Sequence, residues 1–353
     1  MTTLGVVAAG VFAAPGFAAD SSAPALPQPG DTTAVLAPLA PPADSSATQS
    51  GLAQALSGPL SVKALGPNAR VAVFDTDSGN LLYERSGSNP ATPASTNKLL
   101  TSAAVLSAYG ADYRIKTSVV QTSSPTDLVL VGGGDPLLRT TPAAPDESPA
   151  ASLTDLADQT ANALKAAASS GGETPTTLSA TVNFDDSLFT GPRTAPSWPT
   201  SYVTSKLVSP ITALMVNGGG GADPARTAAT TFVSLLKKRG IAVPATPNRV
   251  TASSGATEVA AVNSSALSGV VTHTLTASDN TAAEMLGHLA GVKNGGGGSF
   301  EGGTVAVNRT LDELGIPTNG VRLYDGSGLS RDDQIPAQTI GQVLNKSATS
   351  NAQ

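Results

Sequence analysis

The chain has 353 residues, of which 40% are hydrophobic and only 13% charged, and its net charge is -6 at pH 7. This composition allows two or three domains with small aliphatic cores and excludes a basic nucleic-acid surface. Because the sequence has no cysteine and only two histidines, it excludes disulfides and thiol nucleophiles, and we expect neither a metal nor a cofactor.

The first 50 residues predict export from the cytoplasm. Residues 1–19 are apolar and rich in small side chains, and their last four residues, Gly-Phe-Ala-Ala, resemble a signal-peptidase site. Since the basic start of a secretory signal is missing, the segment predicts either a signal or a membrane anchor. Residues 20–50 are mostly Ala, Pro, Ser and Thr and predict an extended linker. We therefore expect an extracytoplasmic protein associated with the cell wall or membrane.

Hydrophobic periodicity after residue 50 predicts both helices and strands. A polar turn joins two expected strands into a hairpin just before the first long helix. Asp185 and Asp186 would point to opposite faces of a strand, which favours a turn or an ion pair over acid–base chemistry. The expected strands are 70–75, 81–84, 128–131, 181–186 and 259–262, and the expected helices are 51–56, 93–106, 153–168, 227–240, 267–275 and 340–345.

The segment 93–106 predicts a helix with a reactive serine at its start. Pro93 suits a first helical position, and apolar residues then recur at helical spacing. Ser95 would lie at the positive end of the helix dipole, where developing negative charge on its oxygen is favoured. Lys98 follows three residues later on the same face and can act as a base if burial lowers its pKa. The pair predicts a nucleophile and its general base.

A second Ser-x-x-Lys occurs at Ser234 and Lys237, which shows how easily so short a pattern arises in a serine-rich chain. It lies inside the amphipathic helix expected over 227–240, whose last residues are basic as helix ends prefer. We interpret this second copy as structural.

A second polar motif, Ser278-Asp279-Asn280, opens another predicted helix. Ser and Asn both suit helix caps, so capping alone could explain them. Ser-x-x-Lys followed by Ser-Asp-Asn is more specific, because these are two of the three motifs shared by penicillin-binding proteins and serine β-lactamases.

Further stretches resemble one family, the D-alanyl-D-alanine carboxypeptidase/endopeptidases, or class C low-molecular-mass penicillin-binding proteins. They are Pro-Ala-Ser-Thr-Asn-Lys at 93–98, Val-Gly-Gly-Gly-Asp-Pro at 131–136, Asp-Asp-Ser-Leu-Phe at 185–189 and Asp-Gly-Ser-Gly-Leu-Ser-Arg at 325–331. The resemblance implies an α+β serine-peptidase fold, an antiparallel sheet flanked by helices. It implies a catalytic domain formed by 51–110 and 258–353, with inserted domain or domains over 111–257.

The resemblance also implies the chemistry. Ser95 would be acylated by the D-alanyl carbonyl of a peptidoglycan stem peptide, and Lys98 would take its proton. Ser278 would relay a proton to the leaving D-alanine, and Asn280 would bind the substrate amide. β-Lactam antibiotics would be covalent inhibitors of this hydrolase.

The family's third motif, Lys-Thr-Gly, does not occur after Ser278, so we expect a C-terminally truncated chain that lacks the last strands. That motif would supply a carboxylate-binding cation and one of two oxyanion donors, and the loss of one donor costs about 100- to 1000-fold in rate. The alternatives are a non-catalytic exported wall-binding protein with a decayed site and a serine β-lactamase. A Ser-His-Asp hydrolase using His273 or His288 is disfavoured because no Gly-x-Ser-x-Gly occurs.

Overall fold

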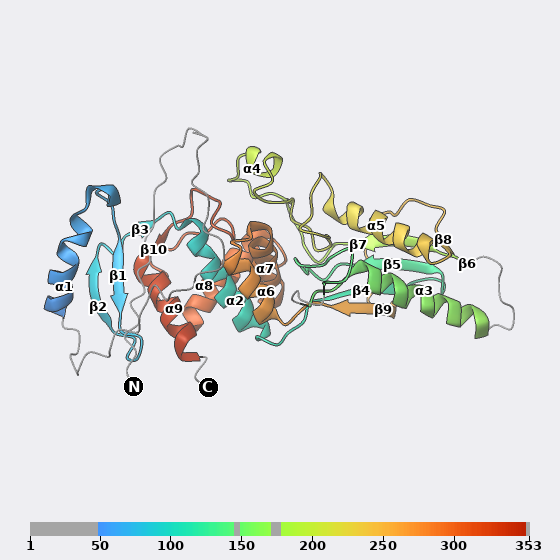
Figure 1. Cartoon of the computed structure of the whole chain (residues 1–353), viewed down its shortest axis with the longest axis horizontal. Helices are drawn as coiled ribbons and strands as arrows, with labels where there is room; N and C mark the ends of the chain where they lie inside the picture. Colours follow the sequence, from blue (N-terminus) through green and yellow to red (C-terminus); the bar gives the residue numbers. More distant parts are fainter. Residues whose placement is uncertain (1–48, 145–148, 171–177, 351–353) are drawn as a thin grey trace, which may run out of the picture.

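The computed structural model describes residues 49–144, 149–170 and 178–350. The expected signal or anchor segment and nearly all of the linker lie outside the described residues. In the described part of the chain, no helix combines the length and the apolar character needed to cross a bilayer. The molecule is elongated, with a helical body and a small hairpin towards one end and a second sheet at the other (Figure 1).

Both ends of the described chain build the helical body. Its antiparallel hairpin pairs Val71 with Arg85, and a two-residue antiparallel pair, β3–β10, joins the approach to Ser95 to the segment before the last helix. The elements are α1 (Gln49–Ser57), η1 (Pro59–Ser61), η2 (Lys63–Leu65), β1 (Val71–Phe74), β2 (Leu81–Arg85), β3 (Pro90–Ala91), η3 (Ala94–Thr96), α2 (Asn97–Tyr109), α6 (Leu267–Thr276), α7 (Asn280–Lys293), α8 (Phe300–Glu313), β10 (Ile335–Pro336) and α9 (Ala337–Ser350).

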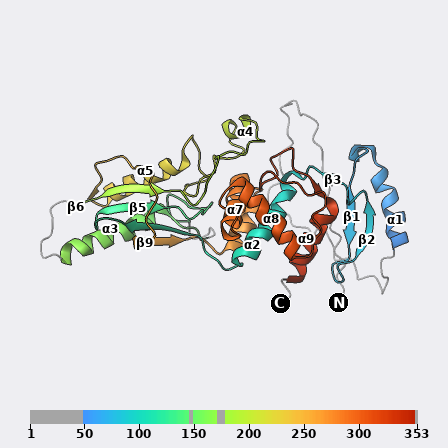
Figure 2. The same cartoon turned by 180° about the vertical axis from the view of Figure 1, so that it is seen from behind.

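Helix α7 is the centre of this body, with α2, α6 and α8 packed around it (Figures 1 and 2). Every residue from Thr281 to Gly291 is buried. Glycines let α7 and α8 approach closely, since a Cβ on Gly303 of α8 would lie 2.9 Å from the Gly287 carbonyl oxygen of α7. One charged side chain, Glu284, lies in the middle of this buried run.

Residues between α2 and α6 form the second body. Its four strands are ordered β7-β5-β4-β9, with β5 and β7 parallel and the other pairs antiparallel. Helices α3 and α5 pack on this sheet and on each other, in a core of aliphatic side chains and two phenylalanines. The elements are β4 (Lys116–Gln121), β5 (Asp127–Val131), α3 (Leu153–Ser170), β6 (Leu178–Ser179), β7 (Thr181–Asp185), α5 (Pro224–Lys238), β8 (Ile241–Ala242) and β9 (Thr257–Asn263).

The pairing of β9 bears on the boundary of the insert. The sequence suggested that the insert ends at residue 257, but β9 pairs with β4 from Lys116↔Asn263 to Gln121↔Thr257. Its hydrogen bonds therefore belong to the insert's sheet. We propose Asn263 as the end of the insert, which moves the boundary by six residues.

The segment 187–222, which contains α4 (Ser201–Thr204), leaves the insert's sheet after β7, packs against the helical body and returns to the insert at α5. Trp198 and Met215 from this segment pack with Met285 of α7 and Phe300 of α8 in one hydrophobic cluster. The Ser209 N–H donates to Thr281 Oγ1 at 3.0 Å. The insert is thus tied to the start of the central helix.

Candidate active site

Ser95 lies in the 3₁₀ turn η3, and α2 begins two residues later at Asn97. The sequence placed Ser95 in the first turn of the α-helix itself. Ala94, the residue before Ser95, has a left-handed backbone, φ 49°, so the α-helix cannot extend back through it. Ser95 is exposed, whereas Lys98 is 1% exposed. The Ser95 residue is therefore accessible to solvent, whereas the Lys98 amine next to it is buried.

The amine of Lys98 has three oxygen neighbours. Its Nζ is 2.7 Å from Asn280 Oδ1, 2.9 Å from the Ser327 carbonyl oxygen and 3.2 Å from Ser95 Oγ. The first two oxygens can only accept hydrogen bonds. A neutral amine has two hydrogens, which these acceptors would take, and its lone pair would then point at the Ser95 hydroxyl. This geometry suits proton transfer from Ser95 to Lys98.

Two opposing influences set the proton affinity of Lys98. Burial lowers its pKa below the ordinary value, because a buried ammonium has lost its hydration. The negative charges of Glu284, Asp325 and Asp279 act in the opposite direction. Burial has the larger effect, so the pKa is lowered overall. A larger fraction of the amine is therefore neutral, and able to accept a proton, than for a lysine in water at the same pH.

Ser278 brings the second motif to the nucleophile, since its Oγ donates to Ser95 Oγ at 3.0 Å. Its backbone has φ 52°, an uncommon left-handed conformation for serine. Helix capping does not explain it, because Asp279 is the N-cap of α7 and accepts from Ala282 N at 3.0 Å. The strained backbone turns Ser278 towards Ser95 while the neighbouring aspartate caps the helix.

Asn280 joins the lysine to the insert. Its Oδ1 accepts from Lys98 Nζ, and its Nδ2 donates to the Leu207 carbonyl oxygen at 2.9 Å. These bonds fix which end of the amide faces the lysine. An amide oxygen has two lone pairs, so one remains for a substrate N–H.

The glycine-rich stretch 325–331 forms a turn against the start of α2. Asn97 Nδ2 donates to the Asp325 carbonyl at 2.9 Å, and Thr101 Oγ1 donates to the Gly326 carbonyl at 2.7 Å. The carboxylate of Asp325, which is 1% exposed, accepts from Trp198 Nε1 at 2.7 Å and from two backbone N–H groups of the turn. Sequence reasoning missed this role for Trp198 and for the Ser327 carbonyl.

Neither histidine is a hydrogen-bond partner of Ser95 within the described residues. His273 is exposed and pairs with Asp279 at 3.3 Å. His288 is buried, its Nδ1 lies 2.8 Å from the Glu284 carbonyl oxygen, and burial lowers its pKa to about 4. A carbonyl oxygen only accepts, so Nδ1 carries the hydrogen and the ring is neutral.

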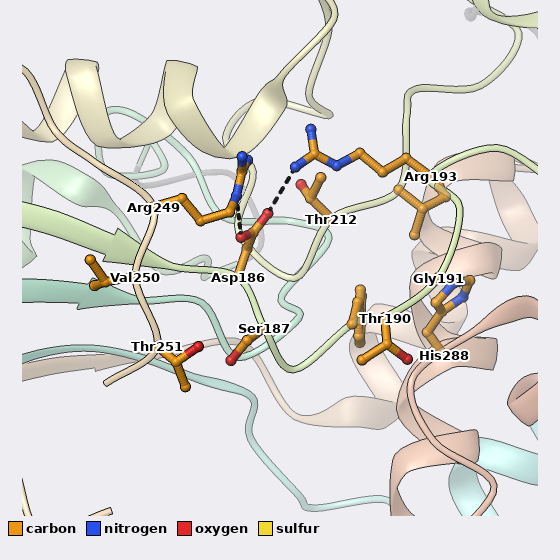
Figure 3. Close-up of a pocket in the computed structure, with 12 residues that line it drawn as sticks. Asp186, Ser187, Thr190, Gly191, Arg193, Thr212, Arg249, Val250, Thr251 and His288 are labelled. Carbon is orange, nitrogen blue, oxygen red and sulfur yellow. Dashed lines mark hydrogen bonds and ion pairs between the residues drawn. The ribbon is translucent and has the colours of Figure 1, made fainter. Parts of the chain in front are cut away.

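His288 lines a different hollow, a cavity of about 490 Å³ between α7 and the insert (Figure 3). There Asp186 lies between two arginines, with Arg249 Nε at 2.7 Å and Arg193 Nη2 at 3.5 Å. Asp185 accepts from the backbone N–H of Ser187 and of Ala252, each at 2.7 Å. The adjacent aspartates therefore serve an ion pair and a turn, as the sequence predicted.

The four residues singled out in the sequence thus meet in one site. Ser95 comes from η3 and Lys98 from the first turn of α2, whereas Ser278 lies two residues before α7 and Asn280 begins that helix. The second Ser-x-x-Lys is apart from them, with Ser234 Oγ bonded to the Thr230 carbonyl of its own helix at 3.0 Å. Among the described residues, no cluster of three or more potential metal-ligating side chains occurs.

A family model described as the D-Ala-D-Ala carboxypeptidase 3 (S13) family matches residues 52–221 and 221–353. A carboxypeptidase of Mycobacterium tuberculosis is 34% identical over 327 residues, which are 89% of this chain and 68% of that protein. Carboxypeptidase DacB of Mycolicibacterium smegmatis is 33% identical over 363 residues, 97% of this chain and 74% of that protein.

Among solved structures, penicillin-binding protein 4 of Haemophilus influenzae superposes with a TM-score of 0.64 at 17% identity. The match covers 81% of this chain and 76% of that one. At this identity the likeness establishes the fold alone, an α+β serine-peptidase fold of the penicillin-binding type.

Proposed function

This chain belongs to the D-Ala-D-Ala carboxypeptidase 3 (S13) family, whose members are serine-type hydrolases, and we propose that Ser95 is its acylated nucleophile. The observation that carries the proposal is the geometry at Lys98. When the two hydrogens of the neutral, buried amine are donated to the Asn280 and Ser327 oxygens, its lone pair is left for Ser95 Oγ, which lies 3.2 Å away.

In the acylation step, Lys98 takes the proton of Ser95 as Oγ attacks the carbonyl carbon between two D-alanines. The C–N bond breaks, and the departing amine of the terminal D-alanine needs a proton. Ser278, whose Oγ lies 3.0 Å from Ser95 Oγ and so beside the reacting carbon, gives its hydroxyl proton to that nitrogen and takes in return the proton that Lys98 received. The product is an ester on Ser95 and free D-alanine.

Deacylation reverses the proton path with water in place of D-alanine. Lys98 is neutral again after the first step, so it can take a proton from water. Water adds to the ester carbonyl, the C–O bond to Ser95 breaks, and Ser95 recovers a proton. Asn280 meanwhile holds the amine and offers its remaining lone pair to the substrate amide.

The substrate that we propose is the stem peptide of peptidoglycan, cleaved outside the cytoplasm. A β-lactam carries a strained amide whose leaving group stays attached after ring opening, so it would acylate Ser95 and remain bound. Whether the preferred bond is terminal or a cross-link depends on the shape of the cleft, and we propose terminal cleavage because the curated relatives are carboxypeptidases.

The test is intact-mass spectrometry of the chain after long incubation with benzylpenicillin. We expect one adduct of the mass of the whole antibiotic. Ser95→Ala should lose the adduct completely.

Ser234→Ala is the matched control, because it removes the serine of the structural Ser-x-x-Lys on an exposed face of α5. It should label like the wild type. His273→Ala should also label, and failure to do so would favour a Ser-His-Asp enzyme. A chain with no adduct would favour the non-catalytic alternative, and an adduct that rapidly hydrolyses would favour a β-lactamase.

A further inference from the structure

We infer that Glu284 is a positioning residue for the acylation of Ser95: it holds the Ser327 carbonyl against Lys98 and offers a negative charge to the ammonium formed there. This inference rests on the proposed function. Glu284 touches neither the nucleophile nor the amine directly, so it would act through the backbone of the turn 325–331.

The carboxylate is aligned with the turn at both of its oxygens. Oε2 accepts from the Gly326 N–H at 2.8 Å, and Oε1 accepts from the Ser327 N–H at 2.8 Å. The carbonyl of that same Ser327 accepts from Lys98 Nζ at 2.9 Å. One residue's backbone therefore connects the glutamate to the base, and its orientation is fixed from both sides.

An ionised Glu284 fits this geometry better than a neutral one. Two backbone donors occupy the two oxygens, whereas a protonated carboxyl would present a hydrogen to one of them. Burial of a group that is 1% exposed raises the pKa of Glu284, and the nearby charge of Asp325 raises it further. The two N–H donors oppose this shift.

Stability alone gives little reason for such a group. A carboxylate buried in an apolar helix loses its hydration, and apolar replacements of buried charges are often neutral or stabilising. Glu284 lies in the middle of eleven consecutive buried residues of α7. Its place in the reaction supplies a reason, because Lys98 becomes an ammonium when it takes the proton of Ser95.

Three acidic groups bear on that ammonium: Glu284 from α7, Asp325 from the turn, and Asp279 at the N-cap of α7. Asp325 already accepts from three donors, and Asp279 caps its helix and pairs with exposed His273. Glu284 is the one of the three that also fixes a ligand of the amine. Its loss should therefore change both rate and pH dependence.

The experiment compares two substitutions that separate charge from position. Glu284→Gln keeps the shape but removes the charge and turns one acceptor into a donor. Glu284→Asp keeps the charge but is too short to reach both N–H groups. The readout is the benzylpenicillin acylation rate of the full chain against pH, and Glu313→Gln, an exposed glutamate on α8, is the control.

For Glu284→Gln we expect the acid limb of the profile to move down by about 1 pH unit, because the amine loses a stabilising anion. Its maximal rate should fall on the order of 100-fold, the effect of a misplaced base. Glu284→Asp should lose rate with the acid limb unmoved. If the Gln variant does not fold, the Asp variant carries the test by its rate, and a wild-type acylation rate in Glu284→Asp overturns the inference.

If both variants have the wild-type acylation rate and the wild-type pH at which the acid limb falls, the inference is overturned while the proposed function is left intact. Equal rate losses with no shift in either variant would also overturn it, since they indicate a merely structural role. A wild-type chain that is never acylated would overturn both proposals together. The control should match the wild type throughout.

Discussion

Gly328 offers a sharp test of how tightly the turn 325–331 abuts the nucleophile. Its φ of +82° lies in the left-handed region, and a Cβ added there would be 1.8 Å from the Ala94 carbonyl oxygen. Such contacts are essentially never under 3.0 Å, so the two chains would have to separate by 3.0 − 1.8, or at least 1.2 Å. Ala94 is the residue before Ser95, so the separation would misplace the nucleophile.

We predict that Gly328→Ala lowers the acylation rate about 100-fold, since a displacement of about 1 Å at a catalytic group has an effect of that order. The left-handed backbone alone should lower stability by about 1–2 kcal/mol. Gly315→Ala is the matched control, because Gly315 has φ +69° with nothing within 4 Å of an added Cβ. It should lose the same stability in urea unfolding but keep its labelling rate. Equal labelling by both variants would refute the argument that this contact places Ser95.

Two further predictions concern the buried groups behind the site. Burial and the charge of Asp325 raise the pKa of Asp333 to about 9, so the folded chain binds a proton there more tightly than the unfolded chain. The stability that this bound proton contributes is therefore full below about pH 4 and is lost as the pH rises through 9. In urea unfolding at a series of pH values, Asp333→Asn should reduce this decrease in the free energy of unfolding. Exposed Asp332→Asn is the control and should leave the decrease unchanged. Trp198→Phe removes the indole N–H that donates to buried Asp325 at 2.7 Å, and should lower the free energy of unfolding by about 1.5–3 kcal/mol. The same urea unfolding measures it. A loss within the error of the assay would show that the indole does not anchor the turn.

The local part of the site could be predicted from the sequence because it depends on helical spacing. A lysine three residues after a serine faces the same way, and the neighbouring aliphatic run predicted the burial that lowers its pKa. The helix over 153–168 and the hairpin before Ser95 also agree with the structure. The start of α2 was misplaced by a few residues, because the left-handed Ala94 has no sequence signal of its own.

The long-range part needed the family resemblance. Nothing in the spacing of Ser278 and Ser95 implies that their hydroxyls meet, and the strained backbone that aims Ser278 is a tertiary feature. Glu284 did have a signal that went unused: a lone carboxylate in an otherwise apolar or small-residue helix. A carboxylate is buried only where hydrogen-bond donors or a positive charge can pair with it. Those donors lie in the turn 325–331, too far along the chain for any local pattern.

The contacts of the site also have a kinetic consequence. Ser95 meets Ser278 across 183 residues of sequence, and Lys98 meets the Ser327 carbonyl across 229. The whole insert lies inside the first of these loops, and contacts between distant residues form late because closing a long loop is entropically unfavourable. During refolding, the helices and the insert's hairpin β4–β5 should appear first. The capacity to react with a penicillin should return last, as the slowest phase.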